Sequence, residues 1–285
     1  MNFKNKLPIA VALLVGLAPT AHTDEISDKG REIFKKQQKT VVTVQVVQKV
    51  TYSAGGRSGE SQEAKQDLTG TVVDPSGLTV VALSATDPTE MYRRMYGDRY
   101  KADLEVSDVK LLLDDGAEIS SEIVLRDKDL DIAFVRPKAK LATPMAAVDL
   151  NKSSPAQVLD VVVTLNRLGR AASRAYSASL ERVSAVVQKP RTFYIPDSSM
   201  TGTESGSPAF ALDGNIVGIM VLRTLAAGSG ASASRTDAAT AIILPAAEVL
   251  KAAKQAPEAK GENEKKEEPK KETKSEDAKP APKKE

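Results

Sequence analysis

The sequence predicts an all-β protein, a barrel or sandwich with helices only near the ends of its ordered region. Three observations carry this prediction. Short stretches that alternate apolar and polar residues recur along the chain and are rich in β-branched residues. Turn signals separate these stretches, among them Asp114-Asp115-Gly116 and Asp213-Gly214, which are typical of hairpins. The helical patterns, by contrast, are few and peripheral.

The first 23 residues have the layout of a secretory signal. Two early lysines precede an apolar run over residues 7–17, and small residues follow from Ala18 to Thr23. The run is short for a membrane span and Pro8 interrupts it, so an uncleaved anchor is the less favoured alternative. We expect cleavage between Ala18 and Thr23, a periplasmic or secreted location, and no stable membrane span afterwards.

The ordered elements begin with an amphipathic helix over residues 27–39, whose Ile33 and Phe34 we expect to be buried. Residues 40–52 alternate and predict a strand, and a mobile polar loop is expected over 53–66. Further strands follow, the first two around a Pro-Ser-Gly turn, and the last leads into a short helix. These segments cover residues 68–83, 106–127, 130–138, 157–169, 174–189, 207–224 and 240–255.

One stretch, residues 87–105, interrupts the β pattern. It contains Tyr92, Tyr96 and Tyr100 at a spacing of four, with methionines and arginines between them. On a helix the tyrosines would form one stripe. We favour a short helix that packs this stripe on the barrel, and the alternative is a contact surface for a partner.

The C-terminal segment 254–285 contains ten lysines and nine acidic residues, with proline and alanine between them. Such a segment buries too little to offset its ordering entropy, so we expect disorder. Because its charges nearly cancel, it does not support a nucleic-acid partner. The chain has no cysteine, no phosphate-binding glycine loop and no zinc-binding spacing, so we expect no cofactor and no metal.

Several motifs resemble the trypsin-like fold in its bacterial HtrA/DegP-type form. GTVVDPSGLTVVALS (70–84) is similar to the family stretch that ends on the catalytic histidine. LLLDDGAEISSEIVLRDKDLDIAFVRP (111–137) resembles the hairpin that leads to the catalytic aspartate. TGTESGSPAFALDGNIVGIMV (201–221) resembles the segment around the nucleophile. SLERVSAVVQ and AIILPAAEVLK match later landmarks in the correct order.

The resemblance implies a trypsin-like double β-barrel with a short N-terminal helix and a C-terminal helix. The division we expect is a signal peptide, a helical lead-in, two barrels and a disordered tail, with no PDZ domain in the sequence after the second barrel. The boundaries are 1–23 for the signal peptide, 24–39 for the lead-in, 40–253 for the protease-like domain with barrels of about 40–140 and 141–253, and 254–285 for the tail.

Carried over residue by residue, the resemblance places the nucleophile on Ser205, the aspartate on Asp131 and the histidine on Ser84 or a residue beside it. No shift supplies a histidine, because the single histidine of the chain is His22, in the signal segment. With no imidazole to orient, Asp131 is expected to bind the Ser84 hydroxyl or backbone amides. A serine without a base is a poor nucleophile.

The expected oxyanion hole is also altered. The family builds it from the backbone N–H groups of the nucleophile and of the residue two before it, here Ser205 and Thr203, and the family has glycine at the second position. Ser207 replaces another family glycine. Glu204 would place a negative charge where an oxyanion develops.

The sequence therefore favours an exported pseudoprotease that binds a polypeptide or protein ligand in the cleft between its barrels, or that regulates an active protease. One alternative is an active serine endopeptidase in which a base other than histidine serves Ser205, for example a buried lysine. The other is a structural envelope protein. The sequence does not fix the oligomeric state.

Overall fold

The structure is a computed structural model that describes residues 25–54, 57–87, 89, 100–198, 204–224 and 239–258. Several sequence-based expectations fall wholly or mostly outside these residues. They concern the signal peptide 1–23, most of the Tyr/Arg-rich stretch 87–105, Thr203, and most of the tail 254–285.

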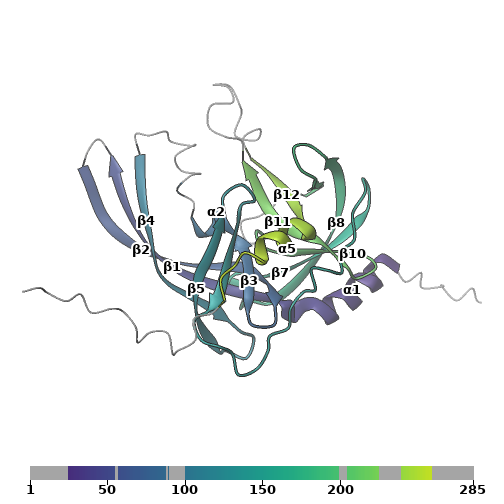
Figure 1. Cartoon of the computed structure of the whole chain (residues 1–285), viewed down its shortest axis with the longest axis horizontal. Coiled ribbons are helices and arrows are strands. Elements are labelled where there is room, and N and C mark those ends of the chain that lie inside the picture. The colour runs from purple at the N-terminus through teal and green to yellow at the C-terminus, as the bar shows by residue number, and fades with distance from the viewer. Residues whose placement is uncertain are drawn as a thin grey trace, which may run out of the picture.

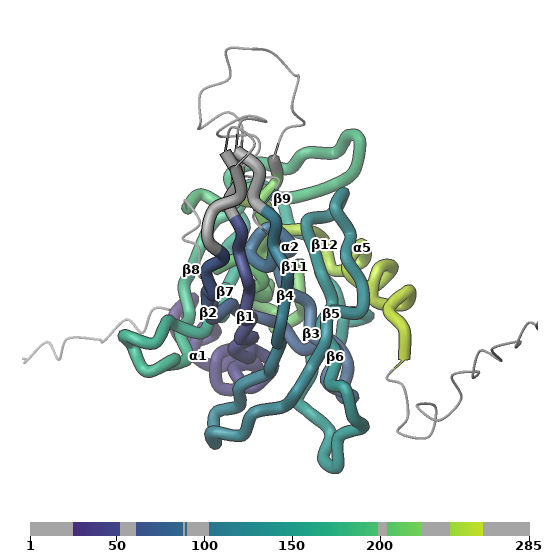
Figure 2. The backbone as a smooth tube through the Cα atoms, turned by 90° about the vertical axis from the view of Figure 1, so that its left-hand side faces the viewer, coloured from purple at the N-terminus to yellow at the C-terminus, as the bar shows by residue number. Residues whose placement is uncertain are grey.

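Twelve described strands form two closed barrels of six antiparallel strands each (Figure 1). In the first barrel the strand order is β1-β2-β3-β6-β5-β4, and Figure 2 shows β2, β1 and β4 side by side along it. The strands are β1 Val41–Ala54, β2 Arg57–Asp74, β3 Leu78–Ala82, β4 Tyr100–Leu112, β5 Glu118–Asp127 and β6 Ile132–Pro137.

The second barrel has the order β10-β11-β12-β9-β8-β7. Its strands are β7 Val161–Arg167, β8 Tyr176–Val187, β9 Phe193–Pro196, β10 Pro208–Ala211, β11 Ile216–Thr224 and β12 Ala239–Pro245. Helix α1, Glu25–Gln37, packs on β7 and β8, and helix α5, Ala246–Ala253, packs on β11 and β12 (Figure 1). This arrangement confirms the predicted all-β double barrel with a helix at each end.

Two local predictions are wrong. The polar loop expected over 53–66 is instead the start of β2, which pairs with β1 down to Ala54 opposite Arg57. Its side chains are polar, but the strand is formed by backbone hydrogen bonds to β1, which do not require apolar side chains. The helix expected over 87–105 cannot include Tyr100–Glu105, because these residues belong to β4.

A short helix, α2 Leu83–Thr86, was not predicted, because Leu83 was expected to end a strand and no element was expected at 84–86. Strand β9 was also missed, because four residues are too few to show a period.

The core is continuous across the molecule. One cluster of buried apolar side chains joins both helices to both barrels, with Ile33 from α1, Phe134 from β6, Phe210 from β10 and Val249 from α5. Separate clusters fill each barrel. Ile33 is buried as predicted, whereas Phe34 is only partly buried.

Candidate functional site

Ser84 and Asp131 are brought together by the pairing of β3 with β6. Ala82, the last residue of β3, lies opposite Ile132, the first residue of β6. Ser84 follows β3 in α2, and Asp131 directly precedes β6. The Leu83 N–H donates to the Asp131 carbonyl at 2.9 Å, which fixes the two segments to each other. The side chains of Ser84 and Asp131 therefore meet at one end of the first barrel.

The Asp131 carboxylate accepts three hydrogen bonds. The Ser84 hydroxyl donates to Oδ2 at 2.8 Å and the Ser84 N–H donates to Oδ1 at 2.8 Å. The third donor is the N–H of Leu222, 3.2 Å from Oδ2, which belongs to β11 of the second barrel. Asp131 thus holds Ser84 and also connects the two barrels.

Burial raises the pKa of the Asp131 carboxyl above its ordinary value, and the hydrogen bonds from Ser84 and Leu222 oppose this shift without cancelling it. In a catalytic triad the aspartate orients an imidazole and stabilises its charged form. Here the Ser84 hydroxyl makes that contact. A hydroxyl is a far weaker base than an imidazole, so the pair cannot take over the histidine's role at neutral pH.

Ser205 lies in a tight loop directly before β10. The next residue, Gly206, has a φ of +94°, and a Cβ atom there would lie 2.3 Å from the carbonyl oxygen of Thr69 on β2. The Gly206 N–H donates to the carbonyl of Met220 on β11 at 2.8 Å, and the Gly206 carbonyl accepts from the Thr71 hydroxyl at 2.7 Å. Only glycine fits this position, and the loop is clamped between the two barrels.

The clamp also places the three positions predicted for the triad in one region. The Cβ position at Gly206 lies 3.5 Å from the backbone nitrogen of Ala82, two residues before Ser84. Ser205 itself is only 7% exposed. The single histidine of the chain, His22, precedes the first described residue, so the described part of the site contains no imidazole.

Thr203 lies outside the described residues, so the geometry of the expected oxyanion hole is not defined. Ser207, on the other side of Ser205, is fully buried, and its hydroxyl has no hydrogen-bond partner among the described residues. A buried hydroxyl without a partner costs about 1–3 kcal/mol. The family glycine at this position would not carry that cost.

The inter-barrel contacts around the site were not predicted. The Thr69 hydroxyl donates to the Asn166 side chain at 2.5 Å, across 97 positions of sequence. Asp67, whose side chain is 9% exposed, pairs with Arg174 at 2.8 Å and Arg170 at 3.2 Å from the second barrel. No sequence pattern marks such partners, because they come from strands and loops far apart in the chain.

The pKa of Asp67 is shifted in the opposite direction to that of Asp131. Burial alone would raise the pKa of Asp67, but hydrogen bonds from Arg170, Gln45 and Arg174 outweigh burial and hold this pKa below its ordinary value. Asp67 is therefore a structural ion-pair partner between the barrels.

The described ranges contain no group of three or more His, Cys, Asp or Glu residues that could hold a metal ion. In the same ranges, no helix has the length and apolar character needed to cross a membrane.

Comparisons with known proteins agree with this architecture. The sequence profile of the trypsin-like peptidase domain matches residues 68–219, which include Ser84, Asp131 and Ser205. The Do-like 14 protein of Arabidopsis thaliana, named as a protease, is 26% identical over 164 residues, which are 55% of this chain and 36% of that protein.

Among solved structures, the HtrA-type protease AlgW, solved with a decapeptide, superposes with a TM-score of 0.55. It is 14% identical, and the match covers 78% of this chain and 64% of that one. The chain thus spans about a third of the curated relative and less than two thirds of the solved one. Since the family profile covers more than half of the sequence, and the two barrels are those of the HtrA-type fold, the chain belongs to the trypsin-like peptidase domain family.

Proposed function

We propose that this protein is an exported pseudoprotease that binds extended polypeptide between its two barrels and does not hydrolyse it. The observation that carries the proposal is the hydrogen bond from the Ser84 hydroxyl to Asp131 at 2.8 Å. The family resemblance assigns to Ser84, or to a residue beside it, the position of the histidine that would deprotonate the nucleophile. In a triad protease, loss of the base lowers kcat by about 10⁶.

Peptide binding is supported by the ordered loop of Ser205 and by the neighbouring strand β11, which do not depend on a catalytic histidine. The loop of Ser205 and the strand β11 are held in place by Gly206, Met220 and the Asp131 bond to Leu222. The related HtrA-type protease was solved with a decapeptide. An extended peptide can add to such a preformed strand through main-chain hydrogen bonds, which do not depend on a catalytic base.

Export is supported by the signal-like layout of residues 1–23 alone. A periplasmic or secreted location would bring the protein into contact with unfolded polypeptides and with active proteases, whose regulation is the finer role we propose.

The proposal is tested by incubating the full chain with unfolded casein. We expect casein to co-elute with the protein in size-exclusion chromatography while its mass stays unchanged. Hydrogen exchange at residues 204–206 and 218–223 is expected to slow in the complex. Ser205→Ala is the matched control and is expected to behave identically. Casein fragments that appear in proportion to protein concentration and disappear with Ser205→Ala would instead support the endopeptidase alternative.

A further inference from the structure

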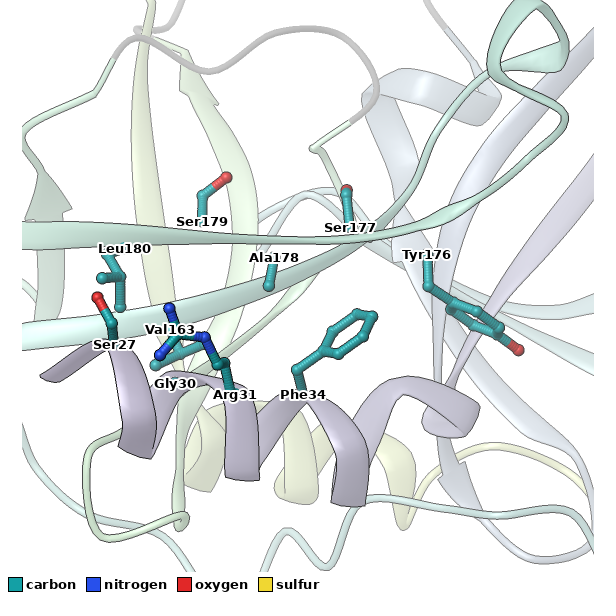
Figure 3. Close-up of a pocket in the computed structure, with 10 residues that line it drawn as sticks. All are labelled: Ser27, Gly30, Arg31, Phe34, Val163, Tyr176, Ser177, Ala178, Ser179 and Leu180. Carbon is teal, nitrogen blue, oxygen red and sulfur yellow. The ribbon is translucent and has the colours of Figure 1, made fainter. Parts of the chain in front are cut away.

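A groove lies between α1 and β8, two elements that contain none of Ser84, Asp131 and Ser205. Its volume is about 330 Å³, within the range of ligand-binding pockets in proteins. Figure 3 shows the Phe34 ring directed toward β8, and Ala178 and Leu180 directed toward the helix. The lining residues are Ser27, Gly30, Arg31, Phe34, Val163 and 176–180.

The floor of the groove is an incompletely covered apolar surface. Leu180 is 47% exposed although it faces the helix, and Phe34 is only partly buried. Gly30 of α1 lies beside Leu180, and a Cβ there would lie 3.4 Å from Leu180 Cδ2. The absence of a side chain at Gly30 keeps this part of the groove open.

Among the described strands, none pairs with one edge of this stretch of β8. Residues 176–182 pair with β7 on one side, whereas β9 pairs only with 183–187 on the other. The backbone of Arg182 points to this side of β8, away from β7. Its N–H donates to the Asp197 carboxylate at 2.9 Å, and its carbonyl accepts from the Asp197 N–H at 2.8 Å.

Backbone groups in a strand alternate between its two sides. The register of β8 with β7 has no irregularity over residues 176–182. Ala178 and Leu180 therefore direct their N–H and carbonyl groups to the same side as Arg182, where no described strand pairs with them. Their side chains face the groove, so the free backbone groups and the cavity belong to one site.

We propose that this site binds an extended polypeptide segment, which adds as a strand to the edge of β8 at 176–180. Main-chain hydrogen bonds to Ala178 and Leu180 hold the segment, and one apolar side chain enters the cavity against Phe34 and Leu180. A polypeptide fits better than a small apolar molecule, because only a repeating backbone matches donors and acceptors two residues apart.

A positive charge in the groove indicates which kind of polypeptide segment it binds. Arg31 is the one charged side chain among the residues that line it, and although Asp28 pairs with Arg31 at 2.6 Å, the arginine side chain is 67% exposed. The segment we propose therefore carries a carboxylate beside its apolar residue.

The test is selection from a phage-displayed decapeptide library on the immobilised full chain, with Ala178→Pro as the counter-selection target. Proline at 178 removes an N–H that points to the open edge and leaves the hydrogen bonds between β8 and β7 intact. Strands accept proline at positions where the N–H is not paired with a neighbouring strand. We expect enriched peptides with an apolar and an acidic residue that bind Ala178→Pro at least tenfold more weakly than the parent chain.

Two further variants test the same site even if the proline variant does not fold. Gly30→Leu fills the cavity and is expected to weaken the selected peptides by at least tenfold. Ser179→Ala, whose side chain points away from the helix in Figure 3, is the matched control and is expected to bind normally. In the complex, hydrogen exchange at the 178 and 180 amides is expected to slow, while the 177 and 179 amides, paired with β7, are slow in both states.

The proposal is overturned if no peptides are enriched over the counter-selection, or if those enriched bind the parent, Ala178→Pro and Gly30→Leu within twofold. It is also overturned if the edge pairs only with a second copy of the chain, seen as a concentration-dependent dimer that Ala178→Pro abolishes. None of these variants touches the inter-barrel site, so casein binding there succeeds or fails independently.

Discussion

The Ser84 hydroxyl lies 2.8 Å from the Asp131 carboxylate and donates a hydrogen bond to it. The partner of the aspartate is therefore a group that cannot act as a base. The Ser84 N–H donates a second hydrogen bond to the same carboxylate, at 2.8 Å. Ser84→Ala removes the hydroxyl and leaves the backbone contact.

We expect Ser84→Ala to lower the free energy of unfolding by about 1.5–3 kcal/mol, the range for a hydrogen bond to a charged group. Urea denaturation measures this, with Ser179→Ala on the exposed part of β8 as the control. A loss no larger than that of the control would show that the Ser84 hydroxyl does not stabilise the fold.

Asp131 and Asp67 are expected to give opposite dependences of stability on pH. Because the pKa of Asp131 is raised in the fold, its contribution favours folding fully below the ordinary aspartate pKa, about 3.9, and is lost as the pH rises through the raised value. The stability of the wild type relative to Asp131→Asn is therefore expected to fall as the pH rises.

The pKa of Asp67 is lowered, so its contribution is present above the ordinary pKa and is lost as the pH falls through the lowered value. The stability of the wild type relative to Asp67→Asn is expected to rise with pH, toward about 2 kcal/mol near neutrality. Urea denaturation of both variants from acid to neutral pH checks the pair, and slopes of the same sign would contradict the assignment.

Gly206→Ala is expected to destabilise the protein by about 2–5 kcal/mol, since it combines a left-handed backbone with a clash at 2.3 Å against the Thr69 carbonyl. Gly116→Ala is the matched control. It has a similar φ of +87° and nothing within 4 Å of its Cβ position, so only the backbone cost of about 1–2 kcal/mol remains. Equal losses in thermal unfolding would mean that the Ser205 loop is not clamped between the barrels.

A substitution in helix α1 is expected to raise the stability of the protein. Gly30→Ala places a methyl group at ordinary contact distance, 3.4 Å from Leu180 Cδ2, and alanine is favoured over glycine in a helix by about 1 kcal/mol. We expect a stability gain of that size in urea denaturation. A loss would show that the helix cannot approach β8 any more closely.

The alternating segments and the hairpin signals at Asp114-Asp115-Gly116 and Asp213-Gly214 were sufficient to predict an all-β barrel or sandwich, and the family resemblance then implied the two barrels. Polar residues at the start of β2 and the four residues of β9 gave no such signal, so the first was taken for a loop and the second was missed. Local patterns do not record backbone pairing with a distant partner, which alone makes these segments strands.

The positions of Ser84, Asp131 and Ser205 came from motif order, and the expected contact between Asp131 and Ser84 is present. The link from Asp131 to Leu222 and the Asp67 ion pairs join residues about a hundred positions apart, and no short-range pattern could have predicted them. Whether Ser205 has a catalytic role stays a prediction.

Ser84→His would place an imidazole beside Asp131, yet we expect little activity because Thr203 and Glu204 remain. A rate on casein within about tenfold of an active relative, ~1.4 kcal/mol in barrier, would show that these two residues matter less than we infer. Adding Thr203→Gly, Glu204→Asn and Ser207→Gly is expected to raise the rate of Ser84→His, and Ser205→Ala in the same background is the control.

The most direct measurement is labelling of the purified full chain with a fluorophosphonate, which modifies a serine only when its hydroxyl is activated, read by intact mass and peptide mapping. The account predicts no adduct at Ser205, with the chain indistinguishable from Ser205→Ala throughout the incubation. One adduct per chain at Ser205, absent from Ser205→Ala, would show that a base other than histidine serves this serine and would contradict the account.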